Sequence, residues 1–260
     1  NVISETDPED RTTTRTFDLR NNRLTETDPN NATTTWTYDA NDNVTSTTDP
    51  EGNVTSQTYN AQRQVLTSTD ARNKTTTNVY DVKGNLTQVT DADGDVTTFT
   101  YDAAGNLLTQ SQTVNGVVET TTNTYDAYGN LLTETDANGN VSTNVYDAAG
   151  NRTSETRTRT LPGGGSETLT ATYVYDKNGR LTKAMDPDGT FTETVYDLAG
   201  RQSSTKDKLG RTTAYEYDLM GRLTKTTYPD TTFEESTYDP EGRRLTSKDR
   251  AGRTTSYEYD

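Results

Sequence analysis

The stretch Tyr101-Asp102-Ala103-Ala104-Gly105-Asn106-Leu107 recurs with variations along the whole chain of 260 residues and decides its fold. An aromatic residue followed by an acid or an amide returns at twelve positions, and nine of the eleven intervals between them are 21 residues, the others being 24 and 29. A period this regular indicates one supersecondary unit stacked many times. The repeat aromatics are Phe17, Tyr38, Tyr59, Tyr80, Tyr101, Tyr125, Tyr146, Tyr175, Tyr196, Tyr217, Tyr238 and Tyr259.

Each repeat is expected to form two β-strands and two tight turns. For the unit that begins at Tyr38, we predict turns at 39–42 and 49–52 and strands at 43–48 and 53–59. Threonine and valine are frequent in the strand segments, as is typical of β-structure. In the Asp-x-x-Gly turns, the aspartate can accept backbone hydrogen bonds and the glycine tolerates a positive φ. Repetition of this unit predicts a continuous antiparallel meander of β-hairpins, without helices.

The composition excludes a thick hydrophobic core. Hydrophobic residues make up 27% of the chain, whereas an ordinary globular domain has roughly 45–50%. We therefore predict an all-β fold in which the hairpins form a single-layer strip. Because strand twist accumulates over many strands, the strip is expected to coil into a spiral, as part of a hollow shell or a repeat solenoid.

The whole chain is predicted to be one repeat array of about twelve units. Hairpin insertions are expected near 110–120, around Val114-Asn115-Gly116-Val117, and near 155–170, around Leu161-Pro162-Gly163-Gly164-Gly165-Ser166. Both interrupt the turn that does not follow a repeat aromatic, so one edge of the strip is expected to be constrained and the other free. The chain opens in the middle of a repeat, and we expect it to be a slice of a longer protein.

A second set of aromatic residues suggests a binding surface. In a strand, the residue two before the repeat aromatic shares its face. Rows of exposed rings can stack on sugars, so these residues are our candidates for glycan stacking. They are Trp36, Phe99, Tyr173, Tyr215 and Tyr257.

Other kinds of site find little support. The chain has no cysteine and no histidine, which removes thiolate and imidazole chemistry. Nearly every aspartate begins a turn, so we predict no catalytic residue, no cofactor and no metal site. Asp91-Ala92-Asp93-Gly94-Asp95 lacks the glycine spacing and the closing glutamate of a calcium loop. A net charge of -15 disfavours nucleic-acid binding, and no apolar run is long enough for membrane insertion.

The motif Tyr-Asp-x-x-Gly-Arg/Asn-Leu resembles the YD or Rhs repeat. It is present at Tyr101, Tyr175 and Tyr217, and it is weaker at Phe17, Tyr38 and Tyr59, where the glycine is replaced. The resemblance implies a spiralled strip of β-hairpins that forms a hollow shell. Such shells enclose a C-terminal toxic domain in bacterial Rhs proteins and insecticidal toxin complexes, and related repeats occur in wall-associated bacterial proteins and in animal teneurins.

From this resemblance we expect a non-catalytic structural region of a bacterial protein that is secreted or lies at the cell surface. It would enclose or display a toxin or effector segment of the same protein. Two alternatives stay open. The array could be an adhesion module that binds surface glycans, or it could associate with itself into an extracellular fibre.

Overall fold

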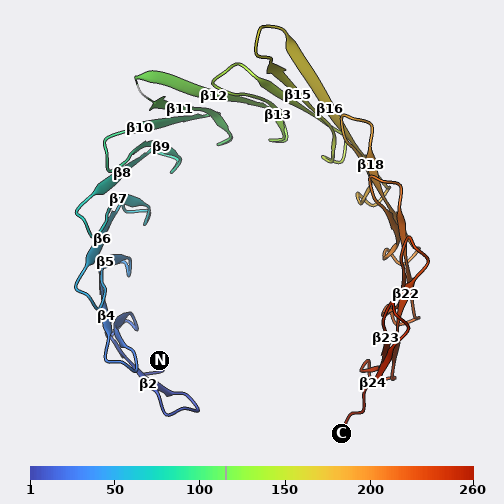
Figure 1. Cartoon of the computed structure of the whole chain (residues 1–260). Coiled ribbons are helices and arrows are strands. Elements are labelled where there is room, and N and C mark those ends of the chain that lie inside the picture. The colour runs from blue at the N-terminus through green and yellow to red at the C-terminus, as the bar shows by residue number, and fades with distance from the viewer. Residues whose placement is uncertain (115) are drawn as a thin grey trace. The chain divides into compact units, whose positions relative to one another are not determined.

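The computed structural model describes residues 1–114 and 116–260. These residues form 24 β-strands and no helix (Figure 1). The strand pairs of the described residues are antiparallel, which confirms the all-β meander of hairpins. The chain divides into two units, unit 1 at Asn1–Thr124 and unit 2 at Tyr125–Asp260.

In unit 1 each strand pairs with the next one along the chain. The last residue of β12, Tyr125, is the first residue of unit 2. The strands are β1 (Ser4–Thr6), β2 (Thr12–Phe17), β3 (Arg23–Thr27), β4 (Thr33–Tyr38), β5 (Val44–Thr48), β6 (Val54–Tyr59), β7 (Val65–Thr69), β8 (Thr75–Tyr80), β9 (Leu86–Thr90), β10 (Val96–Tyr101), β11 (Leu107–Val114) and β12 (Val117–Tyr125).

Unit 2 repeats the same order of pairing. Its strands are β13 (Leu131–Thr135), β14 (Val141–Tyr146), β15 (Arg152–Thr160), β16 (Ser166–Tyr175), β17 (Leu181–Met185), β18 (Phe191–Tyr196), β19 (Gln202–Lys206), β20 (Thr212–Tyr217), β21 (Leu223–Thr227), β22 (Phe233–Tyr238), β23 (Arg244–Lys248) and β24 (Thr254–Ser256).

The strands begin one residue later than predicted. In the repeat of Tyr38, β5 and β6 start at Val44 and Val54 instead of residues 43 and 53. The reason is that the preceding asparagines close the turns: Asp39 N donates to Asn43 O and Asp49 N donates to Asn53 O, each at 3.0 Å. Each of these turns is a three-residue hairpin loop with a left-handed last residue.

The turns keep this geometry where glycine is missing. Gly52 has a φ of 85°, and Asn21, Asp42 and Arg63 take the same place at 68°, 64° and 63°. Thr231 also adopts a φ of 67°, and its N–H donates to Tyr228 O at 2.9 Å. The loop closure therefore imposes the left-handed conformation even on residues that rarely adopt it.

A change of register accompanies the repeat aromatics. Between Thr37 and Tyr38 the pairing with β5 shifts, so that Tyr38 lies opposite Val44. The same shift is seen at other repeats in both units. The bulge brings the aromatic and the residue six positions later, such as Val44 after Tyr38, onto one face of the sheet.

The sheet has two different faces. The aromatic face carries the repeat aromatics and the residues two before them, whereas the threonine face carries the residues one before them. On the threonine face, hydroxyls of facing threonines bind each other, as in the pairs Thr16–Thr25 at 2.7 Å and Thr27–Thr33 at 2.8 Å. No hydrophobic side chain is buried among the described residues. The sheet is thus a single layer within each unit.

Turns alternate between two rows at opposite ends of the strands. We call the row that follows the repeat aromatics the aromatic edge and the other row the far edge. The longest strands meet at the far edge: β15 and β16 have 9 and 10 residues, and β11 and β12 have 8 and 9, whereas the strands of the Tyr38 repeat have 5 and 6. Asn115, in the first predicted insertion, lies outside the described residues. That all twelve repeats form one array stays a prediction.

Candidate interaction surfaces

The aspartates of the aromatic edge hold their turns closed. Asp81 Oδ1 accepts the backbone N–H groups of Lys83 and Asn85, both at 2.8 Å, and Asp81 Oδ2 accepts the Asn85 side-chain amide at 2.9 Å. The Asn85 side chain and these N–H groups lower the pKa of Asp81. The aspartates therefore serve as turn acceptors, as the sequence predicted. The sequence analysis did not predict that the residue after the glycine, here Asn85, binds the second oxygen of the aspartate with its side chain.

In the last repeats this residue is an arginine, and it links successive turns. Arg201 Nε donates to Asp197 at 2.7 Å, its Nη1 donates to Asp218 O at 3.1 Å, and its guanidinium lies 4.6 Å from the centre of the Tyr217 ring. Each such contact joins one turn to the aromatic residue of the next repeat. The same stacking occurs for Arg180 on Tyr196, Arg222 on Tyr238 and Arg243 on Tyr259.

The repeat tyrosines bind backward, to the preceding repeat. Tyr59 Oη donates to Val44 O at 2.8 Å, and Val44 is the residue that lies opposite Tyr38. Burial raises the pKa of Tyr59, as expected for a hydroxyl that is partly removed from water. The same bond is made by Tyr38, Tyr80, Tyr101, Tyr146, Tyr175, Tyr196, Tyr238 and Tyr259.

The insertion in unit 2 shows what selects the carbonyl that each tyrosine hydroxyl binds. Most of these hydroxyls bind a carbonyl 15 residues earlier, but Tyr175 binds Arg152 O, 23 residues earlier. Arg152 is still the residue opposite the previous aromatic, Tyr146. The acceptor is therefore chosen by strand register and not by distance along the chain.

Four of the five candidate glycan-stacking rings lie on separate strands, and Tyr257 directly follows the last strand, β24. In unit 2, Tyr173, Tyr215 and Tyr257 occupy every second repeat, which corresponds to about 19 Å between neighbours at the usual strand spacing. Arginines cover one side of three rings: Arg23 lies 4.2 Å from the Trp36 ring centre, Arg152 5.1 Å from Tyr173 and Arg244 4.9 Å from Tyr257. Phe99 lies in β10, opposite Gln110. Glycan stacking stays a prediction.

Two further aromatic clusters, which the sequence analysis did not single out, lie on the threonine face of unit 2. The ammonium groups of Lys183 and Lys206 lie 4.0 and 5.2 Å from the Phe191 ring centre. Lys225 and Lys248 flank Phe233 in the same way, at 4.8 and 4.7 Å. The spacing of 42 residues between the clusters was readable from the sequence as a period of two repeats.

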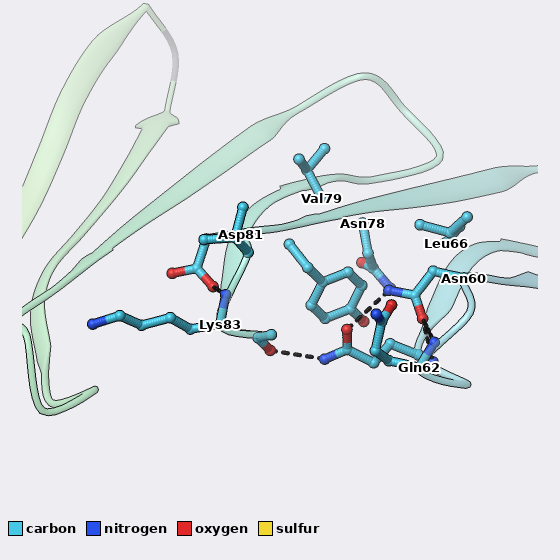
Figure 2. A pocket seen from close by; sticks show the side chains of 11 residues that line it. Asn60, Gln62, Leu66, Asn78, Val79, Asp81 and Lys83 are labelled. Atoms are coloured by element: carbon cyan, nitrogen blue, oxygen red, sulfur yellow. Dashed lines mark hydrogen bonds between the residues drawn. The ribbon is translucent and has the colours of Figure 1, made fainter.

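In each unit an open notch lies between two neighbouring turns of the aromatic edge. In unit 1 a notch of about 650 Å³ lies between the turns of Asn60 and Asp81, with Leu66 and Val79 on its apolar side (Figure 2). Unit 2 has the equivalent notch of about 750 Å³, in which Leu132 and Val145 replace that pair.

Neither a metal site nor a membrane-spanning helix is found among the described residues. They contain no group of three or more acidic side chains placed to hold a metal ion. They also contain no helix with the length and apolarity needed to cross a membrane.

The RHS repeat family matches this chain at residues 20–54, 38–75, 80–118, 125–166, 175–212 and 196–232. No match was found among curated proteins.

Several solved structures share the fold. The crystal structure of TcdB2-TccC3-Cdc42 aligns with a TM-score of 0.52 and 20% identity, over 91% of this chain and 15% of that one. TcdB2-TccC3 without its hypervariable C-terminal region aligns at 0.51 and 20%, over 94% and 16%. The Tc holotoxin pore of Photorhabdus luminescens aligns at 0.51 and 19%, over 94% and 16%. The chain thus spans less than a sixth of each of these three chains.

Proposed function

Because the chain belongs to the RHS repeat family, we propose that it is a segment of a β-sheet wall that encloses or displays another segment of the same secreted or cell-surface protein. The repeats themselves form a structural scaffold. The enclosed segment, in this proposal, is a toxin or effector.

The observation that carries the proposal is the single-layer sheet without a buried hydrophobic side chain in the described residues. A sheet of this kind cannot store a ligand in its interior, but it can separate two spaces. Its strength comes from contacts that repeat along the strip: closed turns, hydroxyl-to-carbonyl bonds and arginine links. Repeat proteins gain stability as a sum of such neighbour contacts.

The turn aspartates are poorly suited to catalysis. The turn aspartates accept hydrogen bonds that lower their pKa, as Asp81 and Asp126 show. A general acid would need the opposite shift. We therefore propose a structural role without enzymatic activity.

Protection from proteolysis tests the enclosure. In the natural protein that carries this chain, we expect a segment outside the repeats to be cut slowly, and cutting to accelerate about tenfold when the wall is weakened by Tyr38→Phe, Tyr59→Phe, Tyr80→Phe and Tyr101→Phe together. Tyr128→Phe is the control, since that ring is 92% exposed at a turn tip. Equal cutting rates in all three proteins would contradict enclosure and leave the scaffold role standing.

A further inference from the structure

The long hairpin of β15 and β16 in unit 2 extends beyond the strand that follows it (Figure 1). β16 has 10 residues, but β17 pairs only with residues 172–175. Pairing with β15 continues over the rest of β16, as far as Thr160 opposite Ser166. Residues 166–171, which we call the projecting edge, therefore have a strand on one side and none on the other.

The backbone groups of the projecting edge alternate between its two sides. Leu161 N donates to Gly165 O at 3.1 Å and closes the hairpin. Since hydrogen-bonded and non-hydrogen-bonded pairs alternate in an antiparallel ladder, every second residue from Glu167 bonds to β15. The N–H and C=O groups of Thr168 and Thr170 therefore point away from β15. No hydrogen bond joins these outward groups to another described residue.

The outer side of β15 ends differently. β14 pairs with β15 as far as Val141 opposite Thr158. Thr160 lies two residues beyond, and its N–H donates to Asn140 Oδ1 at 3.0 Å. A side chain thus satisfies the outward donor of β15, whereas no described side chain does so for the projecting edge of β16.

The projecting edge lacks the features that usually protect an open strand. Such strands often carry lysine, proline or a bulge. The pairing of this edge with β15 has no register shift, and its one charged residue, Glu167, already binds Arg159 at 2.6 Å. A regular, unpaired edge of this kind is a template for a further strand. Its sequence is Ser166-Glu167-Thr168-Leu169-Thr170-Ala171.

The side chains of the edge indicate which strand fits it. Thr168 and Thr170 lie on the threonine face, where their hydroxyls bind those of Thr158 and Thr156 at 3.3 and 3.1 Å. Threonines opposite them would continue this row of cross-strand pairs. Leu169 lies on the other face and suits an apolar residue.

Charge at one end of the edge favours a basic segment. β17 stops opposite Thr172, and the turn that follows it carries Asp186 and Asp188. Lys208 pairs with Asp186, which leaves the charge of Asp188 unpaired among the described residues. Hydrogen bonds from Thr190 lower the pKa of Asp188 and so keep it ionised at neutral pH. The net charge of -15 disfavours a second copy of this chain as the occupant.

We propose that the projecting edge is a strand-addition site, at which a short, basic, extended segment of a partner protein pairs antiparallel with β16. Threonine-like residues of the segment face Thr168 and Thr170. Because the segment runs opposite to β16, its amino end lies at the turn of Asp188, where lysine or arginine is favoured. About five residues, or about 17 Å of strand, cover the edge. The proposal does not depend on what the wall encloses.

Fluorescence anisotropy of a labelled synthetic peptide tests the proposal. The peptide has two lysines followed by three threonine–valine pairs, and the full chain is titrated into it. We expect saturable binding that added sodium chloride weakens. The same peptide with glutamates in place of the lysines should bind at least about tenfold more weakly. A peptide that is N-methylated at its threonines cannot donate to β16, and it should not bind.

Two pairs of variants locate the contact. Thr168→Pro removes an outward N–H without removing a bond to β15, so the hairpin should persist and the Kd should rise at least about tenfold. Thr168→Val keeps the N–H and should leave the Kd nearly unchanged.

The second pair tests the charge. Asp188→Asn should weaken binding several-fold. Asp230→Asn is its matched control, because Asp230 takes the same turn position two repeats later and accepts equivalent bonds from Thr232 N and Oγ1, at 3.1 and 2.5 Å. The control should bind the peptide as the wild-type chain does.

Four results would overturn the proposal. The lysine peptide could bind no more tightly than the glutamate peptide, or the N-methylated peptide could bind as well as the unmodified one. Thr168→Pro could bind as tightly as the wild-type chain. Sedimentation velocity could show a dimer that Thr168→Pro dissociates, which would assign the edge to a second copy. Circular dichroism checks that each variant keeps its sheet, and the N-methylated peptide remains decisive if Thr168→Pro does not fold.

Discussion

The hydroxyl-to-carbonyl bonds of the repeat tyrosines should stabilise the sheet measurably. Tyr101→Phe removes the bond from Tyr101 Oη to Leu86 O, which is 2.8 Å long, and leaves the ring in place. Loss of one such bond costs about 0.5–1.5 kcal/mol. Phe17, which occupies the first repeat, shows that a ring without the hydroxyl fits the position.

Four substitutions together give a clearer effect. Replacing Tyr38, Tyr59, Tyr80 and Tyr101 by phenylalanine should lower the free energy of unfolding of unit 1 by about 2–6 kcal/mol, because sites in different repeats are far enough apart to add. Urea unfolding followed by far-UV circular dichroism measures the whole chain. The fluorescence of the single tryptophan, Trp36 in β4, reports unit 1 alone.

Tyr128→Phe is the control for the chemical change itself. Its ring is 92% exposed at a turn tip, so the substitution should leave the unfolding midpoint unchanged. The reasoning would be refuted if the fourfold variant unfolded at the same urea concentration as the wild-type protein, or if Tyr128→Phe cost as much as Tyr101→Phe. Amide hydrogen exchange should increase only in strands next to the substituted tyrosine.

Three more measurements follow from the turns and the rings. Gly200→Ala should destabilise the chain more than Gly189→Ala. Both glycines have a positive φ, at 88° and 83°, but only at Gly200 would the new Cβ lie 3.0 Å from a side-chain atom, the Nη1 of Arg180. The melting temperatures of the two variants compare the effects. Turn contacts hold the pKa of Asp81 below its ordinary 3.8, so the stability that they contribute is complete at neutral pH and is lost as the pH falls below 3.8 through the lowered pKa. An acid titration followed by circular dichroism should therefore show constant stability down to about pH 4. A loss of stability that begins near pH 6 would contradict this assignment. If the aromatic face binds glycans, Trp36→Ala or Tyr215→Ala should abolish micromolar binding on a glycan array; no binding by the wild-type chain would eliminate that alternative.

Much of the fold could be predicted because its strongest contacts are local. The aspartate at the start of a turn binds groups two and four residues later, so the residue type and spacing state the contact directly. The same holds for the left-handed third position after the first turn residue, although Arg63 and Thr231 show that glycine is a preference and not a requirement. The strand starts were misplaced by one residue because the closing asparagine belongs to the turn.

The contacts between repeats could not be read in this way. Arg201 looks like one more charged residue after glycine, and its stacking on Tyr217 depends on how the next turn is placed. Tyr175 finds its acceptor across an insertion that changes the sequence distance but not the register. The notches also require two turns side by side, with Leu132 and Val145 brought together from neighbouring strands.

The sequence by itself determined the period, the two strands and two turns of each repeat, and the antiparallel meander, because these depend on dihedral preferences and on hydrogen bonds that close within a few residues. Only the tertiary structure decided which carbonyl each tyrosine binds, which ring each arginine covers, and that a notch with an apolar side lies between two turns of the aromatic edge in each unit. The physical reason is the bulge at the repeat aromatics. It shifts the register between strands, and so sets which side chains of successive repeats meet.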